Sequence, residues 1–223
     1  MEIYKNQYER EFRVLEDINT NGIMSACAMA PFDNAKEALK NEGYKVISLE
    51  QMAQLRIQEG KDSAISRLGS WTMEDFVYIP NKGIFLTKNS PIMKNAKKAT
   101  NCSRQGVDLY LDSNQVEKSI EGSYKIKDAE HHVCTPIRIV IPTSRFAEEG
   151  LTSYAFGEHA RNYGEFLKEI GIQDLEICLG NTKKQPFAKK AWFETFENSE
   201  LRGDHDLTGS MGFYGLVRGI KKQ

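Results

Sequence analysis

The sequence predicts an α+β or mixed α/β fold, in which a mixed sheet is flanked by several short helices. Three observations lead to this prediction. Apolar and aromatic runs typical of strands alternate with helix-capping signals. Residues 75–87 have the pattern of a β-hairpin, and Pro136 interrupts a strand predicted over 133–141. Because a hairpin joins antiparallel strands and proline disfavours the centre of a sheet, a purely parallel sheet does not fit.

Size and composition predict a single globular domain over residues 1–223, with a weak subdivision near 122–130. Hydrophobic residues make up 40% of the chain and charged residues 27%, which is ordinary for a folded protein. The formal net charge of -1 provides no overall field that would attract nucleic acid or a membrane. An anionic partner would therefore have to be held by a local basic patch.

The cysteines and the first residues predict a cytoplasmic protein that does not enter a membrane. The spacing of the cysteines contains no C-x-x-C pair, so free thiols in a reducing compartment are the simplest interpretation. Met1–Asn6 carries charges where a signal peptide needs an apolar core. No apolar run approaches the roughly 18 residues of a membrane span. The cysteines are Cys27, Cys102, Cys134 and Cys178.

The first 60 residues combine apolar periodicity with strong capping signals. Ser48 with Gln51 forms a capping-box pattern, and Gly60 supplies the left-handed stop of a helix. Apolar residues near the N-terminus recur at steps of three and four, which favours a helix. Part of the same segment also alternates between polar and apolar residues, as a strand does. The elements predicted here are a helix over 4–18, a strand over 23–30, a helix over 35–42, a strand over 44–47 and a helix from Ser48 to Gly60.

The middle of the chain is predicted from turn and capping residues. Strands over 75–79 and 84–87 form the hairpin, whose Gly83 can take the positive φ that the turn requires. Ser90 and Pro91 are typical of a helix start. The other elements predicted up to residue 141 are a short basic helix reaching Lys98, a strand over 107–111, a helix from Ser113 to Ile120 and the strand over 133–141.

The C-terminal part is predicted from apolar runs bounded by glycine and proline. Gly171 ends a long helix predicted to begin at Thr152 or Ser153, and Pro186 is interpreted as the start of another helix. The elements predicted here are a helix over 152–170, a strand over 175–179, a helix over 186–196 and a strand over 213–220.

Two basic stretches are candidates for an anion-binding surface. Lys94, Lys97 and Lys98 share one face of the predicted helix, and Arg104 follows a polar turn. This arrangement suits a phosphate-bearing ligand or nucleic acid, although a solvated lysine face has the same pattern. In the second stretch, 183–192, lysines are interleaved with aromatic residues that fall on a helical stripe and are more simply explained as core.

Two histidine-containing groups are candidates for catalysis. His159 lies among apolar residues of the predicted 152–170 helix, where it is either a general base or a hydrogen-bonded core histidine. Asp204, His205 and Asp206 precede a glycine-rich stretch and could supply a base with an orienting carboxylate. Since Gly and Asp are also common turn formers, the segment 203–215 fits a turn equally well.

A metal-binding hypothesis rests on the residues before the strand over 133–141. Strand geometry sends His132 and Cys134 to the same face, so two ligands would converge while a third comes from elsewhere. A polar segment leading into a strand is the alternative. No Walker loop, H-E-x-x-H or EF-hand pattern is present, and the sequence identifies no cofactor.

Three functional hypotheses follow. The first is a cytoplasmic binding or interaction protein whose basic patch holds an anionic ligand or nucleic acid. The second is a hydrolase-type or metal-assisted enzyme that uses the glycine-rich 203–215 segment with histidines. The third is an assembly protein that acts through an oligomer interface, for which no residue is diagnostic.

Overall fold

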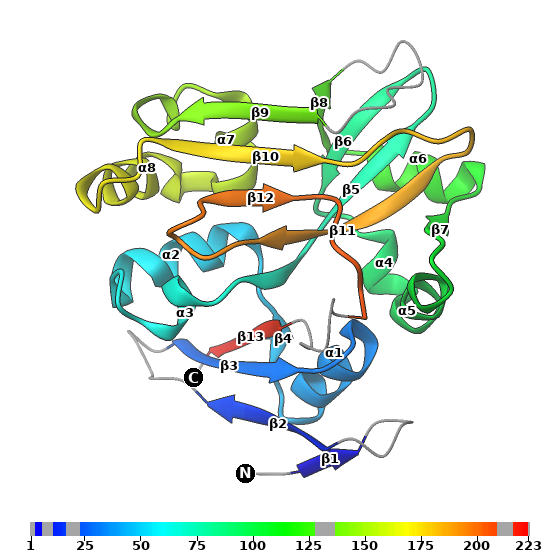
Figure 1. The fold of residues 1–223 in the computed structure, drawn as a ribbon, viewed down its shortest axis with the longest axis horizontal. Helices are drawn as coiled ribbons and strands as arrows, with labels where there is room; N and C mark the ends of the chain where they lie inside the picture. The colour runs from blue at the N-terminus through cyan, green and yellow to red at the C-terminus, as the bar shows by residue number, and fades with distance from the viewer. Residues whose placement is uncertain (1–2, 6–10, 17–22, 128–136, 209–215, 223) are drawn as a thin grey trace.

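The computed structural model describes residues 3–5, 11–16, 23–127, 137–208 and 216–222, which form an α+β fold (Figure 1). Its described strands join in one 13-stranded mixed sheet, with the main order β1-β2-β3-β13-β5-β11-β12-β10-β9. β4 pairs with β13, β6 with β5 and β8, and β7 with β11. The pairs β13 with β5 and β10 with β12 are parallel, whereas the other pairs are antiparallel. The predicted mixed sheet is confirmed.

The strands are short, and the longest of them crosses the centre of the sheet. Their bounds are β1 Ile3–Lys5, β2 Glu11–Glu16, β3 Ile23–Met29, β4 Lys45–Val46, β5 Ser70–Ile79, β6 Gly83–Thr87, β7 Leu109–Tyr110, β8 Tyr124–Lys127, β9 Ile137–Pro142, β10 Asp174–Leu179, β11 Phe187–Phe193, β12 Glu200–Arg202 and β13 Leu216–Lys222.

The helices lie between these strands in sequence. Their bounds are α1 Phe32–Asn41, α2 Leu49–Glu59, α3 Ala64–Arg67, α4 Pro91–Lys94, α5 Ala96–Arg104, α6 Ser113–Ile120, α7 Gly150–Phe156 and α8 Ala160–Glu169, with short 3-10 helices η1 Thr143–Arg145 and η2 Gly157–His159. None of these helices is both long and apolar enough to cross a bilayer.

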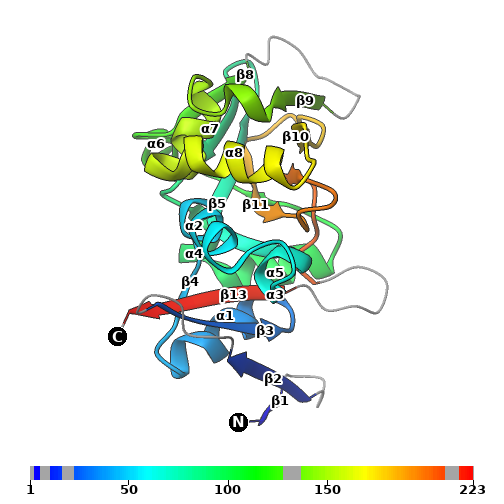
Figure 2. The same cartoon turned by 90° about the vertical axis from the view of Figure 1, so that its left-hand side faces the viewer.

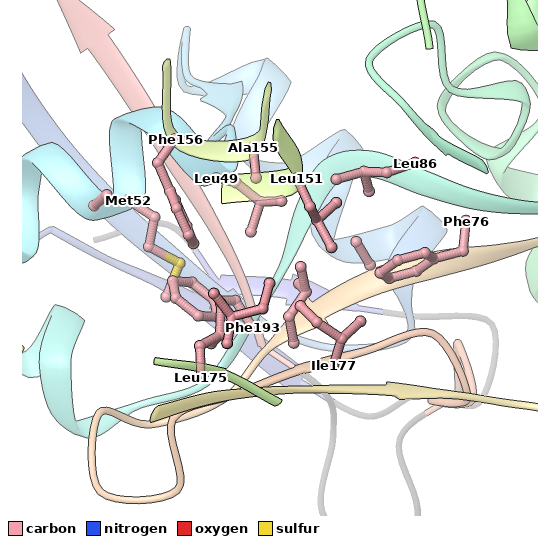
Figure 3. Packing of buried hydrophobic residues seen from close by; sticks show 14 of the residues in the cluster. Leu49, Met52, Phe76, Leu86, Leu151, Ala155, Phe156, Leu175, Ile177 and Phe193 are labelled. Carbon is pink, nitrogen blue, oxygen red and sulfur yellow. The ribbon is translucent and has the colours of Figure 1, made fainter. Parts of the chain in front are cut away.

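Two hydrophobic clusters hold the helices against the sheet. In the larger one, α2, α7 and α8 pack on residues from β10 and β11, and Figure 3 shows Leu49, Phe156, Ile177 and Phe193 converging there. The smaller cluster packs α1 against β3, β5 and β13 around Trp71. In Figure 2, α7 and α8 lie above α2, while α1 lies at the opposite end beside β3 and β13.

Local signals placed several elements correctly. Ser48 and Gln51 form both hydrogen bonds of the capping box at the start of α2, and Gly60 ends that helix with φ 81°. The hairpin pairs β5 with β6, and Gly83 has the predicted positive φ. The Ser90 hydroxyl accepts a hydrogen bond from the Met93 amide, which confirms the predicted start of α4.

The N-terminal helix prediction is wrong. Residues 3–5 and 11–16 are the strands β1 and β2, which pair with each other, and β2 also pairs with β3. The strand-like alternation of Glu11 to Val14 therefore decided this segment, because pairing with an adjacent strand outweighs a helical stripe that also fits the sequence. Residues 6–10 lie outside the described part of the chain.

The long helix predicted over 152–170 is two helices. Gly157, with φ 56°, ends α7, and the 3-10 turn η2 leads into α8. A positive φ is easily adopted by glycine, so the chain changes direction there and α7 and α8 can pack against α2 separately. The predicted stop at the end of this region is confirmed, since α8 ends just before Gly171.

The helix predicted over 186–196 is also wrong, because this segment is the strand β11. It pairs with β5 on one side and β12 on the other, with a register shift between Lys190 and Trp192. That irregularity obscures the two-residue period in the sequence, so the aromatic residues appear to follow a helical stripe.

The remaining predictions hold with shifted bounds. The basic helix is α4 followed by α5, the strand over 107–111 shortens to β7, and Asp112 rather than Ser113 caps α6. β9 and β13 are the described parts of the strands predicted over 133–141 and 213–220. Residues 128–136 and 209–215 lie outside the described part of the chain.

Candidate functional site: a cavity lined by lysines

A cavity of about 690 Å³ opens where α1, β4, β13 and the start of α4 meet. Four lysines line it: Lys36 and Lys40 on α1, Lys45 on β4 and Lys221 on β13. We call this site the lysine cavity. No acidic side chain is among the described residues that line it.

Secondary structure explains how these lysines converge. Lys36 and Lys40 are four residues apart and lie on the same face of α1. Lys45 is opposite Ile220 in the β4–β13 pair, so Lys221 lies next to it along the neighbouring strand. The fold thus brings Lys221, on β13, to the same opening as lysines that lie about 180 residues earlier in the sequence.

Apolar and aromatic groups form the rest of the lining. Val46 and Ile220 come from the paired strands, Met73 from β5 and Met93 from α4. Tyr44 is buried, and the Lys221 ammonium lies 4.3 Å from the centre of its ring. Such an apolar lining with a few charged groups is typical of pockets that bind small molecules.

Lys36 and Lys221 are partly buried, whereas Lys40 and Lys45 are exposed. The Nζ of Lys36 donates a hydrogen bond to the main-chain oxygen of Met93 (2.7 Å), which links α1 to α4 across the cavity wall. Burial lowers the pKa of the Lys36 ammonium; Glu37 acts in the opposite direction, and Lys40 lowers it further. Lys40 is largely exposed and lies 3.8 Å from the Glu37 carboxylate.

A buried ion pair holds this wall in place. Lys190 and Asp75 are both 0% exposed, with Nζ and Oδ1 2.7 Å apart. Lys190 also donates to the main-chain oxygen of Met73 (2.9 Å) and to Ser90 Oγ (3.1 Å). The other oxygen of Asp75 accepts from the amide of Ile92 (2.8 Å), so the pair fixes the start of α4, and with it Met93.

The basic residues predicted from the sequence do not line the cavity. Lys94, Lys97 and Lys98 are exposed on α4 and α5, and Lys94 hydrogen-bonds to Asn89. Arg104 turns inward, with its guanidinium 3.8 Å from Asp33 and 2.7 Å from the Asn101 side chain. In the second basic stretch, Lys183 and Lys189 form ion pairs with the buried carboxylate of Asp108.

The predicted catalytic triplet is divided among separate partners. Asp204 pairs with Arg202 through two hydrogen bonds of 3.0 Å, and Asp206 accepts from Ser103 Oγ at 2.8 Å. The His205 ring lies 4.6 Å from that of Trp192, and its Nε2 is 3.9 Å from Glu194. Burial lowers the pKa of His205, while Glu194 opposes the shift.

His159 is not joined to that triplet. It lies in η2, partly buried, with Nε2 3.6 Å from the carboxylate of Glu158, its neighbour in sequence. Within the described residues, no hydrogen bond or ion pair connects His159 with Asp204, His205 or Asp206. His132 and Cys134, the predicted metal ligands, lie outside the described part of the chain.

One described group has the spacing of a metal site. Glu176, Cys178 and Glu200 on β10 and β12 place ligand atoms within 4.8 Å of one another. However, Arg138 lies 3.1 Å from Glu176 and Arg202 lies 3.0 Å from Glu200. Burial raises the pKa of the Cys178 thiol, and Glu200 raises it further. The two arginines therefore already balance the carboxylates that a cation would need.

Sequence reasoning missed the lysine cavity because its parts are far apart in the chain. The i, i+4 spacing of Lys36 and Lys40 was visible in the sequence, and it was a usable signal. What the sequence does not give is the pairing of β4 with β13, which brings Lys221 beside Lys45.

Comparison with known proteins gives a fold but no family. Neither a protein-family profile nor a curated protein sequence matches the chain. Among solved structures, the chain is similar to one described by the words "Accommodation of massive sequence variation in Nanoarchaeota by the C-type lectin fold". The TM-score is 0.64 and the identity 14%, over 92% of this chain and 100% of that one. At this identity the likeness concerns the fold alone, and the chain shares the C-type lectin fold.

Proposed function

We propose that the protein binds a small anionic molecule in the lysine cavity. The observation that carries this proposal is the convergence of four lysines around one opening whose described lining contains no carboxylate. Like charges at close range repel each other, and an anion bound among them would relieve that repulsion. The hypothesis of a local basic patch is thereby kept, with different residues from those that the sequence suggested.

Size and lining define the ligand further. The cavity volume of about 690 Å³ lies within the range of roughly 300 to 1,000 Å³ common for small-molecule sites. Met73, Met93 and Ile220 offer apolar contact, so the ligand combines a negatively charged group with an apolar body. A helix or a nucleic acid duplex is too wide for a cavity of this volume, which favours a compact molecule over a polymer.

The structural neighbour is consistent with a binding role. The fold of that protein is described as accommodating massive sequence variation, and a scaffold of that kind can present different side chains at a site. For the enzyme hypothesis, by contrast, the described candidates His159, Asp204, His205 and Asp206 have separate partners. General acid–base catalysis needs such groups within reach of one substrate.

The proposal is tested by calorimetric titration of the full chain with inorganic pyrophosphate at low salt. The double variant Lys40→Ala/Lys45→Ala should bind at least about tenfold more weakly, which corresponds to roughly 1.4 kcal/mol. The control is Lys97→Ala/Lys98→Ala, which removes the same charge from the exposed face of α5 and should bind like the unchanged protein. Affinity should fall as salt rises, because partly exposed charges are screened.

Two results would overturn the proposal. One is an absence of pyrophosphate binding at low salt. The other is an equal loss of affinity in both double variants, because net charge rather than the lysine cavity would then explain the interaction.

A further inference from the structure

Lys36 differs from the other lysines of the cavity in its hydrogen-bond partner. Its Nζ donates to a neutral main-chain oxygen of Met93, and no carboxylate within 4.0 Å is recorded for it among the described residues. The bond fixes the direction of one N–H at the wall of the cavity. A neutral acceptor stabilises an ammonium less than a carboxylate does, so the uncharged amine is more accessible here.

Charged groups near Lys36 act on its pKa in both directions. Lys40 lies one helical turn away, and Lys190 on β11 is close enough for Lys36 to lower the pKa of Lys190. The opposing group is Glu37, whose exposed carboxylate lies beside Lys40. Burial is the largest influence on Lys36 and lowers its pKa.

We propose that Lys36 forms a reversible imine with aldehydes that carry an anionic group, the anionic group being held by Lys40, Lys45 and Lys221. The inference deepens the proposed function and rests on it. The geometry supplies both requirements: an amine at the enclosed wall of the cavity, and three further lysines around the same opening. A lysine in an apolar site next to other cationic groups is a recognised form of amine nucleophile.

The chemistry needs no additional reagent. The lone pair of Nζ attacks the aldehyde carbon, and the carbonyl π electrons move to the oxygen, which takes up a proton. Nζ loses a proton, and the resulting carbinolamine then expels water as the C=N double bond forms. The products are one imine and one water, no group is oxidised or reduced, and the addition of water reverses every step.

Reductive trapping of the full chain provides the test, with pyridoxal 5'-phosphate as the probe. Borohydride delivers hydride to the imine carbon and makes the bond permanent, and peptide mass spectrometry then locates the modified lysine. Lys36 should be modified at least about tenfold faster than Lys97 or Lys98, because an amine with a lowered pKa has a larger uncharged fraction at neutral pH. Inorganic pyrophosphate should slow modification of Lys36 and leave Lys97 unaffected.

Variants test whether the Lys36 amine itself forms the imine. Lys36→Arg removes the primary amine, so the preferential modification at position 36 should disappear while Lys97 and Lys98 are modified as in the unchanged protein. The matched control Lys97→Arg should leave modification of Lys36 unchanged.

The outcomes separate the two ideas. If pyrophosphate binds in the cavity but Lys36 is modified no faster than Lys97, the imine is wrong and anion binding stands. If Lys36 is modified preferentially but pyrophosphate neither binds nor competes, the three neighbouring lysines do not hold the anionic group. That result would overturn both the proposed function and the imine as stated.

Discussion

The lysine cavity and the segment from Glu200 to Thr208 are both rich in charge, but their charges are arranged differently. In the segment, Arg202 lies between Glu200 and Asp204, and Asp206 accepts hydrogen bonds from Ser103 and from the amide and hydroxyl of Thr208. In the cavity, four ammonium groups share one opening, and none of the described residues that line it is acidic. Each acidic group of the segment has an ion-pair or hydrogen-bond partner, whereas the cavity brings four lysines together, of which Lys40 has the exposed carboxylate of Glu37 as a partner.

This difference shows why residue type alone is a poor guide to a site. Asp204, His205 and Asp206 have the chemistry of a catalytic group, yet each has a different partner: Arg202, Glu194 and Ser103, respectively. Lysines are common on protein surfaces, yet four of them around a partly apolar cavity are an arrangement that favours an anion. For recognising a candidate site, the partner that a charged group already has is more informative than the type of residue that carries the charge.

The largest expected effect is on stability, and it separates the loss of a buried, paired lysine from the loss of a lysine that lines the cavity. Lys190→Met should lower the free energy of unfolding by about 3 to 5 kcal/mol, because it leaves the buried Asp75 carboxylate without its cation. Lys40→Met removes an exposed ammonium and should change stability by less than about 0.5 kcal/mol. Urea denaturation measures both values, and similar losses in the two variants would contradict the distinction.

Substitution of Asp206 is expected to have an intermediate effect on stability. Burial acts to raise the pKa of this carboxyl, but hydrogen bonds from Thr208 and Ser103 outweigh it, and the pKa is lowered. Asp206→Ala should lower stability by about 1 kcal/mol at pH 7 and leave pyrophosphate affinity unchanged.

Because the folded pKa of Asp206 is depressed, its contribution to stability is present above the unfolded pKa of about 3.9 and is lost as pH falls through the folded pKa. The two proteins should therefore become closer in stability in acid, as measured by urea denaturation at several pH values. Weaker pyrophosphate binding by Asp206→Ala would show that the segment and the lysine cavity are not independent.

The smallest effect concerns His205. Burial lowers the pKa of this histidine, so the unfolded chain takes up its proton before the folded chain does. Stability should be complete above the unfolded pKa of about 6.5 and decline slightly as pH falls from there toward the folded pKa. His205→Gln should remove this part of the pH dependence, and NMR titration should find a His205 pKa below 6.5; a higher value would contradict the burial seen beside Trp192.

Local signals were sufficient where the chain makes its own hydrogen bonds. The capping box of Ser48 and Gln51, the Ser90 cap and the Gly83 turn each depend on residues a few positions apart, and the sequence located all three. The α+β class followed from these elements together with the hairpin. The helix predictions over 4–18 and 186–196 were wrong, because the strands described there, β1, β2 and β11, depend on pairing with other strands.

The candidate site was less predictable than the fold. The sequence predicted a local basic patch on Lys94, Lys97, Lys98 and Arg104, and none of these residues lines the lysine cavity. Spacing within a helix shows which lysines share a face, as it does for Lys36 and Lys40. It does not show whether that face forms a cavity with other elements. Here the other wall is formed by β4 and β13, which pair with each other.

The position of β13 also affects how the protein acquires its site during synthesis. This strand, residues 216–222, lies between β3 and β5, so the pairing that joins β3 to β5 in the sheet forms only when the last part of the described chain has emerged. Contacts that span almost the whole chain form late and slow the search for the native state. Because Ile220 and Lys221 line the cavity, a nascent chain that still lacks them has an incomplete cavity, and the proposed binding would begin only after the fold is finished.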